Sequence, residues 1–190
     1  MKVEQSFVVA RALPQVWAAF QDVPAMAQCL PGASLTEDKG GGVYAGRIQT
    51  KLGPFSAAFD GEATVTTDPA NHTGRVEGKG VDKRGGSRSK LVLTYALVPE
   101  GSQTRVNIDA DVTLSGPIAQ FGRTGFLTET SNVLIREFVS VLERKLAAET
   151  PAEAEAVRAE ETSALALLVR AIRAWIASWF RRSAPPERPR

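Results

Sequence analysis

The sequence is poor in the residues on which most enzymes rely. It has one cysteine, Cys29, and one histidine, His72. A single cysteine excludes a disulfide within the chain and a zinc site built from several thiolates. A single histidine also leaves few of the common nucleophile–base arrangements open. Cys29 lies among apolar residues and is expected to be a small buried hydrophobic residue, whereas His72 lies beside a turn and is expected to be exposed.

Other catalytic and targeting signals are also missing. No glycine-rich loop with nucleotide-phosphate spacing is present. Asp109 and Asp111 lie two residues apart on the solvent side of a predicted strand, and nothing in the sequence pairs an acid with a base. The first ten residues lack the long apolar run of a secretory leader, so a cytosolic start is expected. We therefore expect no enzyme, no metal site and no catalytic residue.

Basic residues gather in the segment GKGVDKRGGSRSK, between two predicted strands. They are Lys79, Lys83, Arg84, Arg88 and Lys90. This cluster suits either a solvated hairpin or a surface for phosphate or for an acidic partner. It has no interleaved aromatic side chains on which bases stack, which argues against nucleic acid.

Alternating apolar and polar residues dominate the first two thirds of the chain and predict strands. The expected strands are residues 3–10, 43–52, 55–67, 72–83, 87–98 and 104–114, and the segments LPQVWAAFQDV and PAMAQCL after the first strand are expected to form short helices. A regular in–out alternation is typical of an antiparallel sheet with one wet face.

Residues 118–146 carry apolar side chains at helical spacing, which predicts one helix of about 29 residues and ~43 Å. Such a helix has to lie across one face of a curved sheet. The sequence therefore predicts an α+β fold of two layers in which the sheet grips the helix.

Several inward-facing positions of the predicted sheet hold small residues, among them Ala57 and Gly80. These residues either bend the sheet around the helix or leave volume for an apolar ligand. The residues expected to line such a cavity are Phe59, Gly61, Ala63, Val76, Gly78, Leu93, Tyr95, Ile108, Ala110, Val112, Phe121, Gly122, Gly125, Phe126 and Leu134.

The end of the chain differs in composition from the rest. We expect a domain over residues 1–147, a polar linker over 148–162, an amphipathic helix over 163–182 and a disordered basic end over 183–190. The helix carries the candidate membrane-binding residues, which are Leu165, Leu168, Val169, Arg170, Ile172, Arg173, Trp175, Ile176, Trp179, Arg181 and Arg182.

The two central arginines decide how this helix meets a bilayer. Spanning would bury Arg170 and Arg173 near the midplane, at about 2.5–3.5 kcal/mol each. Lying flat removes that cost, lets the arginines face anionic headgroups and places Trp175 and Trp179 at the interface. Interfacial attachment is therefore the main expectation, and spanning, or docking on a partner or on the domain itself, is the alternative.

Four segments together resemble a known family: VWAAFQDVPAMAQCLPGAS, KLGPFSAAFDGEATV, DKRGGSRSK and DVTLSGPIAQFGRTG. The region from Phe7 to Leu146 resembles the CoxG subunit of carbon monoxide dehydrogenase, within the START-like helix-grip (SRPBCC) superfamily. The resemblance implies an accessory role beside a molybdenum hydroxylase of the CO dehydrogenase type, through membrane recruitment or delivery of a hydrophobic carrier. It does not imply that the chain binds molybdenum or oxidises carbon monoxide.

These observations lead to one expected function. The chain would hold a quinone or a lipid, with no covalent cofactor, and would sit in the cytoplasm at the inner face of the membrane. A pure membrane adaptor without a ligand, or an enzyme like some helix-grip proteins, is the alternative. By analogy with the superfamily, the glycine-rich segment SGPIAQFGRTGF is expected to be a gate to the cavity, with close packing of the helix start as the alternative.

Overall fold

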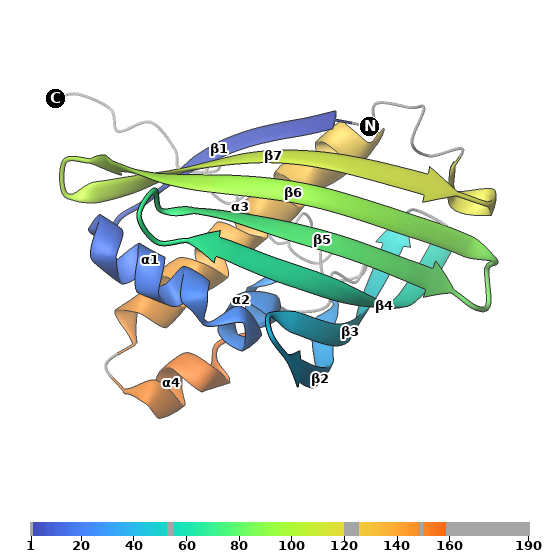
Figure 1. Cartoon of the computed structure of the whole chain (residues 1–190), viewed down its shortest axis with the longest axis horizontal. Coiled ribbons are helices and arrows are strands. Elements are labelled where there is room, and N and C mark those ends of the chain that lie inside the picture. Colours follow the sequence, from blue (N-terminus) through green and yellow to red (C-terminus); the bar gives the residue numbers. More distant parts are fainter. Residues whose placement is uncertain (1, 53–54, 120–125, 149, 159–190) are drawn as a thin grey trace, which may run out of the picture.

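A curved antiparallel sheet with helices on one face organises the chain in the computed structural model, which describes residues 2–52, 55–119, 126–148 and 150–158 (Figure 1). The elements are β1 (Lys2–Val9), α1 (Leu13–Gln21), α2 (Val23–Cys29), β2 (Ala33–Gly40), β3 (Val43–Leu52), β4 (Phe55–Asp68), β5 (Thr73–Asp82), β6 (Ser87–Glu100), β7 (Gln103–Ser115), α3 (Phe126–Ala147) and α4 (Pro151–Ala156). This is the predicted α+β architecture.

The sheet has the strand order β1-β7-β6-β5-β4-β3-β2 within the described residues. Strands β2 to β7 form a meander of hairpins, in which β2 was not among the expected strands, and β1 then pairs with β7, so the first and last strands are neighbours. In that pair, Val3 lies opposite Ala110 and Phe7 lies opposite Val106. The N-terminal strand thereby extends the inner apolar face that β6 and β7 begin.

The alternation in the sequence becomes two chemically different faces. Tyr95, Leu97 and Val106 are buried on the inner face, whereas their neighbours Thr94 and Asn107 are exposed on the outer face. Successive side chains of a strand point to opposite sides of the sheet. Alternating apolar and polar residues therefore place the apolar side chains of every strand on the face that contacts the helices.

Helices α1 and α2 cover one end of the inner face. Pro14 lies in the first turn of α1, where its missing N–H costs nothing, and Val16 and Phe20 follow four residues apart on the buried side. The Asp22 carboxylate accepts a hydrogen bond of 2.9 Å from the Ala25 N–H and caps α2. Each helix therefore begins at a residue suited to a helix start, a first-turn proline in α1 and a capping aspartate in α2.

The long helix starts later than the sequence predicts. Residues 117–119 form a single 3₁₀ turn, in which the Ala119 N–H donates to the Gly116 carbonyl at 3.0 Å, and α3 runs over Phe126–Ala147. The predicted start at Ile118 is wrong because this turn follows a left-handed Gly116 (φ +81°), and such a residue separates one element from the next. At 22 residues, α3 is ~33 Å long rather than ~43 Å.

A short helix follows α3 inside the segment predicted to be a linker. The Thr150 hydroxyl accepts from the Glu153 N–H while the Glu153 carboxylate accepts from the Thr150 N–H, which forms a capping box at the start of α4. Lys145 Nζ donates to the Ala154 carbonyl at 2.8 Å, and Val157 packs against the core. The first part of the linker is thus attached to the domain, at the end where α2 and α3 meet (Figure 1).

Candidate functional site

Aromatic side chains fill one half of the inner face. The Phe20 ring lies 5.1 Å from Tyr95 and 6.4 Å from Phe138, and Phe138 lies 6.0 Å from Phe7, measured between ring centroids. Edge-to-face and tilted rings at these distances add stability beyond the area that they bury. This half, beneath α1 and the second half of α3, is a packed core that also contains Val9, Val16, Leu97, Val106, Val141 and Leu142.

Tyr95 belongs to this packed half, although the sequence assigned it to the ligand cavity. Its ring lies over Gly74 on the neighbouring strand, so that a Cβ atom at Gly74 would come within 2.2 Å of the ring carbon Cζ. Burial raises the pKa of the Tyr95 phenol. The glycine at position 74 therefore provides the space that the tyrosine ring occupies.

A smaller apolar cluster lies at the opposite end of the inner face. Ala57 and Ile118 are buried there, with Phe59 and Leu114 packed against them. The Ser87 hydroxyl accepts a hydrogen bond of 3.3 Å from the Ile118 N–H. The chain that follows β7 is thereby attached to the turn between β5 and β6.

Most of the cavity residues predicted from the sequence lie on the inner face, many of them between these two clusters. Their exposure is intermediate, unlike that of the packed core. The half-buried residues are Phe59, Gly61, Ala63, Val76, Gly78, Leu93, Ile108, Val112 and Leu134, and the buried ones are Tyr95 and Ala110. Phe121, Gly122 and Gly125 lie outside the described residues, and of Phe126 only the helical backbone is described. The described candidates on the strands thus share one face of the sheet, and Leu134 lies on α3.

The glycines of this region serve different purposes. Gly46, Gly61 and Gly80 lie opposite one another on β3, β4 and β5. A Cβ atom at Gly61 would lie 2.1 Å from the Lys79 carbonyl oxygen, and one at Gly46 would lie 2.8 Å from the Ser34 carbonyl oxygen. At these two positions the close approach of neighbouring strands requires glycine, which supports the bending interpretation there.

Gly78 is different, because a Cβ atom there would meet nothing closer than the Leu91 Cβ at 3.7 Å. This is ordinary van der Waals contact, so a side chain has room to begin at this position. Gly78 is therefore the glycine of the set that best fits the prediction of unfilled apolar volume.

The reactive side chains of the chain lie apart from one another. Cys29 is fully buried, as expected, and burial raises its pKa to about 11 in spite of the nearby cations Lys145 and Arg144. His72 was expected to be exposed but is half-buried, with its ring 5.2 Å from Trp17 in an edge-on contact. Within the described ranges, no three metal-binding side chains gather.

The outer face of the sheet carries two hollows that the sequence did not indicate. One of about 840 Å³ lies over the middle of the sheet and is lined by polar side chains such as Ser6, Thr66 and Asn107. The other, of about 510 Å³, lies beside the β5–β6 hairpin, and both cations (Lys79, Arg88 and Lys90) and carboxylates (Asp60 and Glu62) line it. The basic cluster of the sequence therefore reaches an outer-face hollow.

All candidate membrane-binding residues, from Leu165 to Arg182, lie outside the described residues. In the part of the chain that the structure describes, none of the helices combines the length and the apolar character needed to span a bilayer.

The fold matches solved structures at low sequence identity. A conserved protein from Geobacillus kaustophilus shares 19% identity at a TM-score of 0.68, covering 77% of this chain and 95% of its own. A START superfamily protein from Mycobacterium smegmatis shares 18% at 0.54, covering 78% and 99%, and a protein from Thermus thermophilus shares 17% at 0.57, covering 79% and 100%. The fold is thus the START-like helix-grip fold.

The family is shown by sequence. The family model for CoxG, a subunit of carbon monoxide dehydrogenase, matches residues 6–147. The chain belongs to this family. A comparison with curated proteins found no match.

Proposed function

We propose that this chain is a membrane-tethered accessory protein of a molybdenum hydroxylase of the CO dehydrogenase type. It holds a hydrophobic ligand, such as a quinone or a lipid, between the sheet and α3, and it recruits the enzyme to the inner face of the membrane. It carries out no reaction of its own. The CoxG family supports the association with the enzyme, and the START-like fold supports the binding role.

The contrast between the two halves of the inner face carries the ligand proposal. Aromatic rings close one half, whereas in the other half apolar residues such as Phe59, Ala63 and Val112 stay half-buried and Gly78 leaves room for a side chain. Apolar binding sites are mostly lined by residues of this kind, with few polar groups. A flexible hydrocarbon or isoprenoid chain suits this lining better than a polar metabolite does.

The membrane proposal is supported by the chemistry of the C-terminal sequence. Its apolar stripe includes Trp175 and Trp179, and Arg170 and Arg173 lie on the other side of a helical projection. Tryptophan is favoured at the membrane interface, and each arginine near an anionic surface contributes about 1 kcal/mol.

Ligand binding is tested by native mass spectrometry of the full-length protein purified from membranes. The wild-type protein is expected to carry an apolar molecule, and Gly78→Leu is expected to lose most of it because the new side chain extends into the inner face. Thr94→Leu places the same side chain on the exposed outer face and serves as the control. A wild-type protein without a ligand that still binds membrane and enzyme would instead identify a pure adaptor.

Membrane attachment is tested by flotation of the full chain with vesicles that contain phosphatidylglycerol. The double variant Arg170→Glu/Arg173→Glu is expected to reduce the floated fraction strongly, because two favourable charges become repulsive. Equal flotation of the variant and the wild-type protein would rule out the tail as the electrostatic anchor.

A further inference from the structure

Two lysines face each other on the outer face of the sheet. The register of β5 and β6 places Lys79 directly opposite Lys90. Like charges at directly opposed positions of an antiparallel pair destabilise the sheet. The next outward-facing pair places Arg88 opposite Val81, and both side chains are exposed. Folding alone thus gives no reason for this concentration of positive charge.

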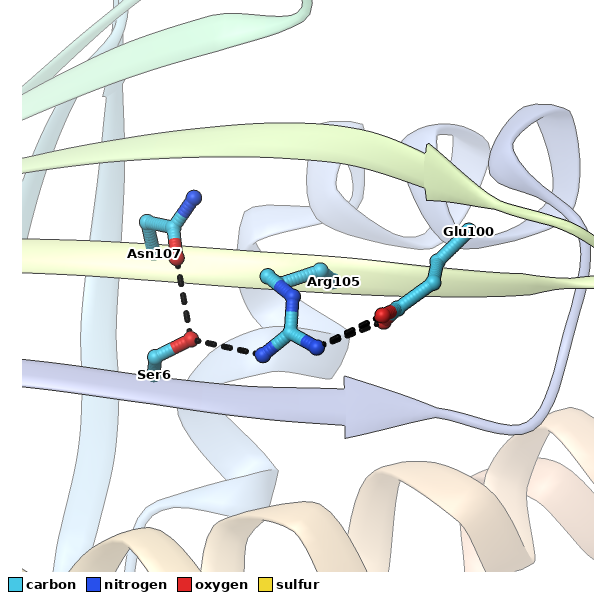
Figure 2. Close-up of polar contacts among 4 residues, drawn as sticks. All are labelled: Ser6, Glu100, Arg105 and Asn107. Carbon is cyan, nitrogen blue, oxygen red and sulfur yellow. Dashed lines mark hydrogen bonds and ion pairs between the residues drawn. The ribbon is translucent and has the colours of Figure 1, made fainter.

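Cations elsewhere on the outer face are neutralised by neighbours. Figure 2 shows Arg105 Nη2 bound to both Glu100 carboxylate oxygens, at 2.7 and 2.8 Å, and Arg105 Nη1 at 3.5 Å from the Ser6 hydroxyl. Arg75 Nη2 lies 2.6 Å from Glu77. The rule on this face is therefore that an arginine is held by a carboxylate.

The cations of the hairpin depart from this rule. Among the described residues, no carboxylate lies within 4 Å of Arg88 or Lys90, and Lys79 Nζ reaches Glu62 only at 3.8 Å. Glu62 is already ion-paired with Lys39, whose contact is the main cause of the lowered pKa of the Glu62 carboxyl.

The remaining carboxylates of this region are also occupied. Asp60 is held by Arg47 at 2.6 Å. Asp82, only 4% exposed, points into the hairpin and accepts the N–H groups of Arg84 and Gly85 at 3.0 Å each. Among the described residues, Arg88 and Lys90 consequently have no carboxylate within 4 Å, and Lys79 shares Glu62 with Lys39.

We propose that this group of side chains is a docking surface for an acidic face of a partner protein. The basic surface consists of Lys79, Arg88 and Lys90 together with Thr113 and Ser115, whose side chains lie opposite Lys90 and Arg88 on β7. It lines the hollow of about 510 Å³ together with Asp60 and Glu62, whose carboxylates are held by Arg47 and Lys39, and the Lys79 side chain is 76% exposed. Lysine, arginine and hydroxyl groups arranged in this way donate to carboxylates of an approaching surface.

The charge pattern around the basic surface favours a protein over a lipid bilayer. Asp109, opposite Thr94, and Glu4, opposite Asp109, lie on the same outer face about four residues along the strands, ~13 Å away. A uniformly anionic bilayer that covered this face would be repelled by these carboxylates. A protein surface can match both signs, and such complementarity determines orientation and association rate.

This inference rests on the proposed function for the identity of the partner, the molybdenum hydroxylase. The test measures binding of the purified hydroxylase to full-length protein by biolayer interferometry at low and high salt. Lys90→Glu is expected to weaken binding at least about tenfold and to reduce its salt dependence. Arg75→Glu changes the net charge equally on the same face and is expected to change the affinity less than about twofold.

Thermal stability separates this role from a structural one. Lys90→Glu is expected to keep or raise the melting temperature, because a carboxylate at this position faces Lys79 instead of a like charge. A variant that is at least as stable as the wild-type protein yet binds the enzyme weakly would support the docking surface.

Three results would overturn the inference. If wild-type protein and Lys90→Glu bind the hydroxylase equally, the basic surface is not the docking site, although the proposed partnership stands. If the wild-type protein does not bind the hydroxylase, the partnership fails and the docking surface with it. If Lys90→Glu loses binding to phosphatidylglycerol vesicles but not to the enzyme, the surface belongs to the membrane.

Discussion

A single methyl group added at Gly61 is expected to disturb the sheet where it bends. The new Cβ atom would lie 2.1 Å from the Lys79 carbonyl oxygen and 2.8 Å from the Gly80 Cα. Both atoms belong to the backbone of the neighbouring strand, so no side-chain rotation relieves the contact. Strand β5 has to move away from β4, which weakens the hydrogen bonds on either side of the Gly61–Gly80 pair.

The same substitution at Gly78 provides a matched control on the next strand. There the Cβ atom meets the Leu91 Cβ at 3.7 Å and the Glu62 carbonyl oxygen at 3.8 Å. Alanine at a compatible glycine position stabilises a protein by about 0.4–1 kcal/mol, since the unfolded chain loses freedom. Overpacking of the kind expected for Gly61→Ala costs about 1–3 kcal/mol.

The two variants should therefore differ in stability by about 1.4–4 kcal/mol. At about 2–4 °C per kcal/mol for a chain of this size, this corresponds to a gap of roughly 3–16 °C in melting temperature. The assay is thermal unfolding of both variants and the wild-type protein, followed by far-UV circular dichroism in the same buffer. If Gly61→Ala melts as high as Gly78→Ala, the close approach of β4 and β5 does not explain the glycine.

Two further substitutions and two measurements on Cys29 test other parts of the structure. Thr104→Val should lower the free energy of unfolding by about 1–2 kcal/mol in a urea titration, because the buried Thr104 hydroxyl donates to the Arg11 carbonyl at 2.8 Å; an unchanged value would contradict that role. Cys29, with its pKa of about 11, should react slowly with a thiol reagent at pH 8 and rapidly after unfolding. Because that pKa is raised above the ordinary thiol value of 9.0, its contribution to stability is present below pH 9 and is lost as the pH rises towards 11, which a pH series of melting temperatures measures. Lys145→Met removes the hydrogen bond to the Ala154 carbonyl and should speed hydrogen exchange in residues 150–158, with little change in the sheet.

The alternation of residues predicted the strands because it depends on neighbours in the chain. From Phe55 to Leu114, the period of two identified each strand and the side of the sheet on which its apolar residues lie. Short segments rich in turn-forming residues, DPAN and PEGSQ, lie where β4 turns into β5 and β6 into β7. The start of α3 was misplaced because the apolar spacing from Ile118 onward resembles a helix, while the break at Gly116 depends on backbone conformation.

The sequence predicted which face of the sheet carries the candidate site, but not how much of the space beside that face is left unfilled. The sequence placed Tyr95 and Leu93 on the same side of β6, and the structure agrees. It did not reveal that Phe20 meets both Tyr95 and Phe138, which is more than a hundred residues away in the chain, and that these rings close that half of the interior. Nor did it distinguish Gly61, where the neighbouring strand leaves no room, from Gly78, where a side chain has room to begin.

By itself, the sequence determined the strands and helices other than β2 and α4, the two faces of the sheet and the membership of the CoxG family. The tertiary structure alone decided which part of the inner face is filled, where the sheet bends and which charges face each other, such as Lys79 and Lys90. The physical reason is the distance along the chain over which each property is set. Alternation and turn preference depend on adjacent residues. Packing and strand register depend on residues that are far apart in the sequence and that only folding brings together.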